Sequence, residues 1–190
     1  MKTVVVYASK YEFTKGIAEF IAEKLQQNGI LAEVREVKAV HDLAGFDAIV
    51  IGSALYMGHW MKEATEFVRR NSTTLANHQV WLFSSGPLGT ETKDAQGRDL
   101  TVGAEPKEIT EFMEAIHPRD HHVFFGGLDS SKLSLAHKMI RKLPAARAIL
   151  SEGDFRNWKD IEVWAMSIAR ELEALQTPPR NAPIMMMGAK

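Results

Sequence analysis

The chain contains no cysteine among its 190 residues. This absence excludes disulfides, thiolate zinc sites, iron–sulfur clusters and cysteine nucleophiles. No apolar run approaches the roughly 18 residues of a membrane-spanning helix, and the opening MKTVVVYASK turns polar too soon for a signal peptide. The net charge is only −1, so no global positive field indicates nucleic-acid binding. We therefore expect a cytoplasmic, single-domain enzyme or carrier.

Short apolar runs rich in β-branched residues alternate with amphipathic segments along the chain. The runs predict strands over residues 3–8, 31–37, 46–53, 79–84 and 121–125. Apolar spacings of three and four predict helices over 17–25, 60–68, 105–116 and 161–175. This alternation is typical of a doubly wound α/β fold. We expect a five-stranded parallel sheet in the order 2-1-3-4-5, with helices on both faces.

Three segments lie outside the alternating strands and helices that a doubly wound α/β fold requires. Residues 86–104 are rich in Gly, Asp and Thr and predict a long loop. Residues 129–151 have a helical pattern and basic residues, which predicts a basic helical insertion. The last residues, 176–190, contain three prolines and no periodicity, which predicts a flexible tail. We expect residues 1–175, with the loop 86–104 and the insertion 129–151 inside them, to form a single domain.

The carboxyl ends of the predicted strands are where a ligand should bind. In a doubly wound sheet the site lies at the switch point, where the strand order reverses direction, and here this point falls between the first and third strands. The loop 9–14 runs into a helix start, whose unpaired N–H groups and partial positive charge suit a phosphate. The alternative is that Thr14 is an ordinary N-cap.

Two further loops should reach the same edge of the sheet. In loop 53–59, Tyr56 or Met57 could pack on a flat heteroaromatic ring, and His59 could hydrogen-bond a ligand or begin the next helix. The glycines of loop 84–89 could leave backbone N–H groups open to ring oxygens. Either loop could instead be an ordinary turn. The sequence has no HExxH or other metal-binding spacing.

The loop 9–14 (SKYEFT) resembles the phosphate loop of the flavodoxin-like family, approximately S/T-x-T-G-x-T, with both end hydroxyls present. Longer phrases resemble the flavodoxin-domain proteins grouped with menaquinone-dependent protoporphyrinogen IX dehydrogenase. They are IGSALYMGHWMKEATEFVRRN, WLFSSGPLG, FFGGLDSSKL and EGDFRNWKDIEVWA. The resemblance covers about residues 2–175 and implies an FMN site built from the three loops.

The resemblance implies a binding role for each loop but assigns no catalytic residue. The residues implied at the phosphate are Ser9, Lys10, Tyr11, Glu12, Phe13 and Thr14. Those implied on one side of the flavin ring are Ala54, Leu55, Tyr56 and Met57. Those implied on the other side are Ser84, Ser85, Gly86, Pro87 and Gly89.

Glu12 stands where the family pattern has glycine. A non-glycine residue with positive φ costs roughly 1–2 kcal/mol, and a carboxylate repels a dianionic phosphate. Two arrangements would reduce the conflict: Glu12 points to solvent while its N–H faces the ligand, or Lys10 offsets its charge. We predict FMN binding that is weaker than in a typical flavodoxin.

The resemblance leaves three functions open. The first is an FMN-dependent oxidoreductase, similar to protoporphyrinogen dehydrogenase, with a small-molecule redox substrate or a quinone as partner. The second is a soluble flavodoxin-type electron carrier, although the net charge of −1 is low for electrostatic docking. The third is a binding module that has lost FMN, for which Glu12 is the only support.

The basic stretch 130–151 makes a testable prediction about membranes. It contains five basic residues and no acidic one, interleaved with leucine, methionine and isoleucine. Such a stretch can bind the anionic inner face of a membrane, or it can be an ordinary surface helix packed on the core. If it binds membranes, the protein cosediments with anionic vesicles at low salt and is released at high salt. Neutral vesicles are the control, and failure to cosediment at low salt contradicts the prediction.

Overall fold

The computed structural model describes residues 1–91, 93, 96–132 and 152–176. The strands are β1 (Lys2–Ala8), β2 (Leu31–Glu36), β3 (Ala48–Tyr56), β4 (His59–Trp60), β5 (Gln79–Ser85), β6 (Asp120–Phe124), β7 (Gly127–Leu128) and β8 (Gly153–Asp154). The α-helices are α1 (Phe13–Gln27), α2 (Lys62–Arg70), α3 (Ser72–Leu75), α4 (Ile109–Ile116) and α7 (Trp158–Gln176). Most of the predicted insertion 129–151 and nearly all of the predicted tail lie outside the described residues.

The main sheet has the order β2-β1-β3-β5-β6, and all of these neighbours pair in parallel. Because β4 is a short strand that pairs antiparallel with β3, the five parallel strands have the predicted order 2-1-3-4-5. Val5 is opposite Val34 of β2 and Val50 of β3, and Val50 is opposite Trp81 of β5. The expectation of a doubly wound α/β fold is confirmed.

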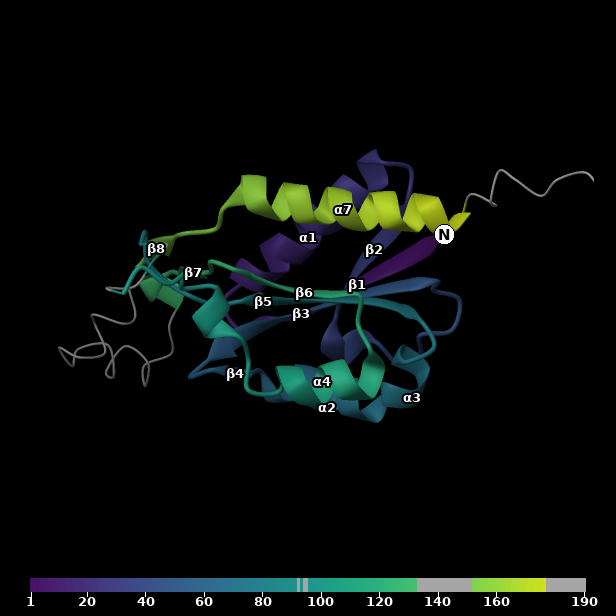
Figure 1. The fold of residues 1–190 in the computed structure, drawn as a ribbon, viewed down its shortest axis with the longest axis horizontal. Helices are drawn as coiled ribbons and strands as arrows, with labels where there is room; N and C mark the ends of the chain where they lie inside the picture. Colours follow the sequence, from purple (N-terminus) through teal and green to yellow (C-terminus); the bar gives the residue numbers. More distant parts are fainter. Residues whose placement is uncertain (92, 94–95, 133–151, 177–190) are drawn as a thin grey trace, which may run out of the picture.

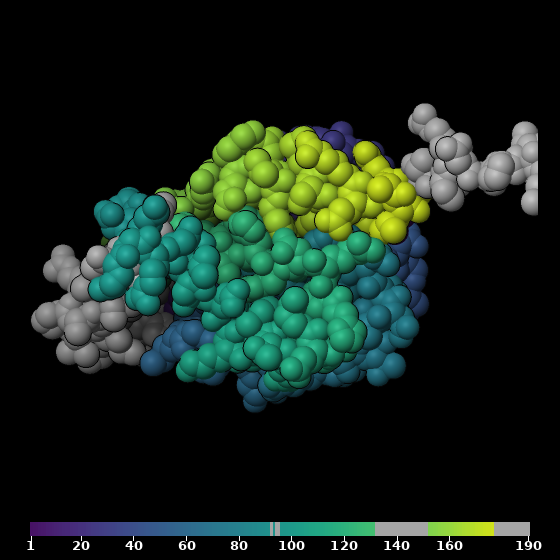
Figure 2. Space-filling view, viewed as in Figure 1, coloured from purple at the N-terminus to yellow at the C-terminus, as the bar shows by residue number. Residues whose placement is uncertain are grey.

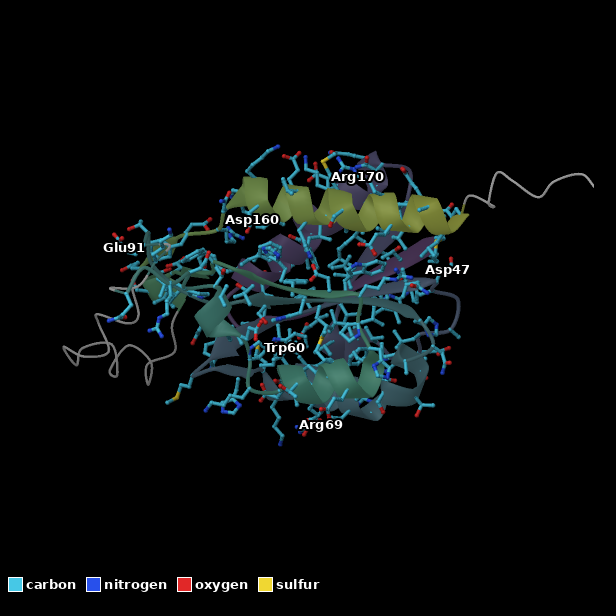
Figure 3. All side chains as sticks on the ribbon, viewed as in Figure 1. Asp47, Trp60, Arg69, Glu91, Asp160 and Arg170 are labelled. Atoms are coloured by element: carbon cyan, nitrogen blue, oxygen red, sulfur yellow. The ribbon has the colours of Figure 1, made fainter. Side chains whose placement is uncertain are left out.

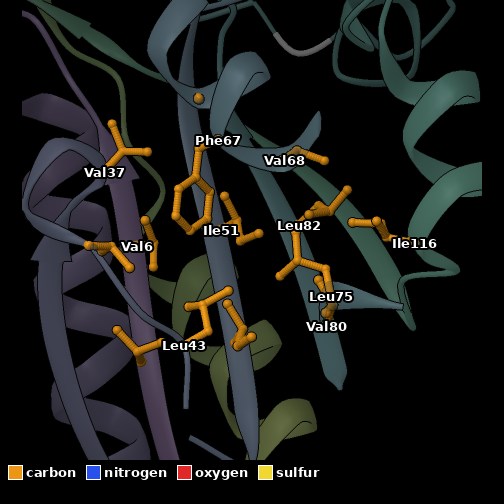
Figure 4. Close-up of a cluster of buried hydrophobic side chains, with 14 of the residues drawn as sticks. Val6, Val37, Leu43, Ile51, Phe67, Val68, Leu75, Val80, Leu82 and Ile116 are labelled. Carbon is orange, nitrogen blue, oxygen red and sulfur yellow. The ribbon is translucent and has the colours of Figure 1, made fainter. Parts of the chain in front are cut away.

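Helices cover both faces of the sheet (Figure 1). On one face α1 and α7 pack over Val5, Val50 and Trp81. On the other face α2, α3 and α4 enclose a second cluster, where Phe67 of α2 lies against Ile51 of β3 (Figure 4). Successive strand residues alternate between these clusters, as the period of a strand requires. Both clusters exclude water, which explains the continuous apolar runs in the sequence.

Three predicted boundaries need correction. The third strand runs on to Tyr56, because Leu55 and Tyr56 pair with β4 in a hairpin. The predicted helix over residues 60–68 therefore begins at Lys62, with Trp60 in β4. The predicted helix over 105–116 begins at Ile109, because Glu105 is extended and the Ile109 N–H donates to the Pro106 carbonyl.

The segment 86–104 crosses between β5 and α4 with little regular structure. Among its described residues it has one isolated bridge, Lys93 to Asp99, and the 3-10 turn Val102–Ala104. It stands out as a teal lobe at the end of the molecule where β7 and β8 lie (Figures 1 and 2).

A chain of hydrogen bonds links β4, β5 and β6. Trp60 Nε1 donates to Ser84 Oγ at 2.8 Å, and Ser84 Oγ lies 2.9 Å from His121 Nε2. Trp60, which is labelled in Figure 3, also packs on Phe112 of α4, with ring centroids 5.1 Å apart. The indole can only donate, so Ser84 Oγ accepts from Trp60 and keeps a proton that it can donate to a neutral His121. Burial lowers the pKa of His121 to about 4, so the ring stays neutral at physiological pH.

The low pKa of His121 predicts acid sensitivity. The unfolded chain takes up this proton near its ordinary pKa of about 6.5, whereas the folded protein resists until about 4. The contribution of neutral His121 to the free energy of unfolding is therefore fully present above pH 6.5, and it is lost as the pH falls toward 4. Because of this group, the free energy of unfolding measured in urea should be lower at pH 5 than at pH 7 by on the order of 2 kcal/mol.

The variant His121→Gln should lose most of that pH dependence. His41→Gln is the matched control, because His41 is exposed and lies on a loop. Equal pH dependence in wild type and His121→Gln would contradict the assignment.

Candidate functional site

A cavity of about 1040 Å³ opens at the carboxyl ends of the parallel strands. Loops that follow β1, β3, β5 and β6 line it, together with the segment 98–104. Its lining residues are Ser9, Tyr11, Phe13, Thr14, Ala54, Leu55, Tyr56, Met57, Gly58, Ser85, Gly86, Pro87, Leu88, Arg98, Asp99, Leu100, Val102, Gly103, Ala104, Gly126, Gly127 and Leu128. This is the switch-point location and the upper size range of a small-molecule site.

The first wall is the start of α1. The Gly16 N–H donates to the Glu12 carbonyl at 2.9 Å as the first turn closes, and no side chain caps the helix. The N–H groups of residues 13–15 therefore lack intrahelical acceptors and concentrate the positive end of the helix dipole. Thr14 is the second helical residue and is nearly fully buried, so the alternative that it is the N-cap is wrong.

Glu12 adopts the left-handed conformation, with φ of 70°. Its carboxylate is more than half exposed and pairs with Lys15 at 3.1 Å. The hydrogen bond to Glu12 raises the pKa of Lys15. The cation that offsets Glu12 is thus Lys15 rather than Lys10, because the helix brings residues three apart together. Neither Lys10 nor Glu12 lines the cavity; the Lys10 ammonium lies 5.7 Å from the Tyr11 ring centroid.

The second wall is the β3–β4 hairpin. Its two turn residues, Met57 and Gly58, both have positive φ, at 54° and 77°. Positive φ at both residues gives a two-residue hairpin turn a backbone twist that matches the twist of its strands. Met57 is 96% exposed at the tip, whereas Tyr56 is 39% exposed and faces the cavity. Burial, with a smaller contribution from Tyr11, raises the pKa of Tyr56 to about 12, so its phenol is a neutral donor at physiological pH.

His59 serves the hairpin rather than the cavity. Its Nδ1 lies 2.7 Å from Glu108 Oε1, and the Glu108 carboxylate also accepts the Trp60 N–H at 3.3 Å. The Lys107 N–H donates to the Gly58 carbonyl at 2.9 Å. These bonds fix the hairpin to the residues that precede α4, and His59 does not line the cavity.

The third wall follows β5. Ser85, Gly86 and Pro87 line the cavity as their positions predict, whereas Ser84 and Gly89 do not. Ser84 is fully buried and points to the opposite side, toward Trp60. Successive side chains of a strand alternate between its faces, and here Ser85 lines the cavity while Ser84 faces Trp60.

Two parts of the lining escaped the sequence prediction. The first is 126–128, which follows β6 and reaches the same edge as the other strand ends. A predicted strand over 121–125 followed by two glycines was the available signal, and the strand-end rule applied to it would have found these residues. The second is 98–104, a segment that no sequence pattern directs toward the cavity.

Among the described residues, no three His, Asp or Glu side chains are grouped to hold a metal ion. In the same part of the chain, no helix is both long and apolar enough to span a membrane.

Comparison with known proteins places this architecture in a family. A family described as a flavodoxin domain matches residues 4–148. Protoporphyrinogen IX dehydrogenase (quinone) of Escherichia coli K12 is 31% identical over 77 residues, which are 40% of this chain and 42% of that protein. The match to this relative thus covers less than half of its length.

Solved structures share the fold at low identity. Rubredoxin oxygen:oxidoreductase from the anaerobe Desulfovibrio gigas superposes with a TM-score of 0.59 and 14% identity, over 93% of this chain and 37% of that one. A flavodoxin from the domain Archaea superposes with a TM-score of 0.55 and 17% identity, over 91% of this chain and 99% of that one. The family match covers well over half of the sequence, and we conclude that the chain belongs to the flavodoxin-domain family.

Proposed function

We propose that the protein is an FMN-dependent oxidoreductase. The observation that carries this proposal is the cavity at the carboxyl ends of the strands, with an uncapped helix start at one wall and aromatic and glycine-rich walls beside it. A helix start suits a phosphate, and flat apolar walls suit a heteroaromatic ring. Both features belong to one cavity, as a phosphorylated flavin requires.

The residues present fit such a cofactor. The N–H groups that begin α1 and the hydroxyls of Ser9 and Thr14 would bind the phosphate. The β3–β4 hairpin, with Tyr56, and the backbone of 85–87 would bound the ring. When bound, FMN supplies the redox chemistry. The chain supplies binding and orientation, and Tyr56 contributes a neutral hydroxyl rather than a charge.

Within this proposal, the substrate class is a reduced porphyrin-type molecule and the electron acceptor is a quinone. The similarity to protoporphyrinogen IX dehydrogenase (quinone) over 77 residues supports it. The segment 98–104 supports it as well, because it enlarges the cavity with Leu100 and Val102 beyond the three ligand loops. A quinone acceptor would bring the protein to the inner membrane face, in line with the contact predicted for 130–151.

The first test is cofactor retention. The purified protein should keep visible flavin absorbance after FMN is added and the excess is removed by gel filtration. Thr14→Val should weaken FMN binding by roughly fivefold to tenfold, because it deletes one hydroxyl in the phosphate wall. Thr65→Val is the matched control, since Thr65 is also buried but lies in α2, away from the cavity.

A folded protein that retains no flavin would contradict the proposal and favour a binding module. If flavin is retained, oxidation of a porphyrinogen to a porphyrin, with a soluble menaquinone analogue as the electron acceptor, distinguishes an enzyme from an electron carrier. A carrier would exchange electrons without turning over the porphyrinogen.

The effect of Glu12 on the cofactor can be divided into charge and backbone contributions. Glu12→Gln removes the carboxylate alone, whereas Glu12→Gly also removes the cost of the left-handed conformation. Both variants should bind FMN about fivefold more tightly, because about 1 kcal/mol of repulsion from the phosphate is lost. Flavin fluorescence titration at low and high salt measures this.

Of the two variants, only Glu12→Gly should also gain stability, by about 1 kcal/mol in urea unfolding. Unchanged FMN affinity in both variants would mean that the exposed carboxylate, paired with Lys15, has no influence on the cofactor.

A further inference from the structure

Arg156 lies between β8 and α7 and is held from several sides. Its Nε and Nη2 donate to the two oxygens of Asp154 at 2.8 and 2.6 Å, and its side chain is only 14% exposed. The guanidinium stacks 4.4 Å from the ring of Trp158, the first residue of α7. The hydrogen bonds from Arg156 lower the pKa of Asp154. The guanidinium of Arg156 is therefore held in place, and the Asp154 carboxylate balances its charge.

The third nitrogen of Arg156 reaches the start of α1. Its Nη1 donates to the Phe13 carbonyl at 3.2 Å, across 143 residues of sequence. The Phe13 ring lies 5.0 Å from the guanidinium carbon. Gly16, one turn further along, leaves the space that the guanidinium occupies, since a Cβ there would come within 2.5 Å of Nη1. Arg156 thus contacts the first turn of α1 by a hydrogen bond, a ring face and close packing.

The same contacts connect α1 to the antiparallel pair formed by β7 and β8. Gly127 is opposite Asp154 in that pair, and the Phe155 N–H donates to the Gly126 carbonyl at 3.0 Å. The Phe13 ring packs so closely on Gly127 that a Cβ there would lie 2.2 Å from it. Phe13 is therefore enclosed between Gly127 and Arg156, and both Phe13 and Gly127 line the cavity.

We propose that Arg156 is a positioning residue that fixes the first turn of α1 against the antiparallel pair β7–β8 and so shapes the phosphate end of the cavity. The part of this inference that concerns the phosphate rests on the function proposed above. Because Asp154 balances the charge, the role of Arg156 is geometric. Lysine keeps that charge but has no fork to hold Asp154 and the Phe13 carbonyl together.

Hydrogen exchange of the protein without added flavin tests the structural part. Arg156→Lys should accelerate amide exchange several-fold in peptides that cover residues 13–20 and leave residues 21–27 unchanged. Arg170→Lys is the matched control: it makes the same chemical change on α7, toward the other end of the helix from Asp160 (Figure 3). Unchanged exchange in Arg156→Lys, or uniform acceleration over all of α1, would overturn the proposal.

A comparison of FMN with riboflavin tests the phosphate part. Riboflavin lacks the phosphate, so Arg156→Lys should weaken FMN binding at least tenfold and riboflavin binding less than twofold. Equal losses for both ligands, or no loss for either, would overturn a role at the phosphate end. If the wild-type protein binds neither ligand, the proposed function fails, while the exchange experiment still decides whether Arg156 fixes the start of α1.

Discussion

The burial of the central sheet on both faces is the constraint from which the rest of the structure follows. Residues 4–6 of β1 and 48–51 of β3 have no exposed surface, because helices cover each side. No side chain on these faces can meet a ligand. The cavity opens instead at the edge where the parallel strands end, and every one of its walls except 98–104 follows directly from a strand end.

Close approaches between backbone and side chains shape that edge. Gly86 lies beside Leu55, where a Cβ would come within 2.6 Å of the leucine methyl group. Gly127 makes the comparable approach to Phe13. Both glycines are required for space rather than for a left-handed backbone. The walls of the cavity therefore depend on pairs of residues from different loops, and a change in one loop is transmitted to its neighbour.

Most of the architecture could be predicted from the sequence, whereas a smaller part of the candidate site could be. Continuous apolar runs such as TVVVYA identify strands buried on both faces, and the order of the five parallel strands follows from their alternation with helices. The end of β3 at Tyr56 was not predictable, because a hairpin partner of two residues decides it. The side chain of Ser84 turns away from the cavity because of strand alternation, which becomes readable only when the strand bounds are known.

Contacts between residues that are far apart in the sequence could not be predicted, for a different reason. The salt bridge of Glu12 with Lys15 is local and follows from helical spacing once the start of α1 is known. The contact between Arg156 and the Phe13 carbonyl joins residues that are 143 positions apart. No periodicity encodes such a contact, because it depends on how the last helix returns to the first. Residues 98–104 reach the cavity in the same non-local way.

Two hydrogen bonds between neighbouring walls have a consequence for the thermodynamics of binding. The Gly86 N–H donates to the Phe124 carbonyl at 2.9 Å, and the Gly126 N–H donates to the Pro87 carbonyl at 3.0 Å. The loops after β5 and β6 are thereby cross-linked and must fluctuate together. A ligand that enters between such walls orders little additional backbone, so less conformational entropy opposes its association.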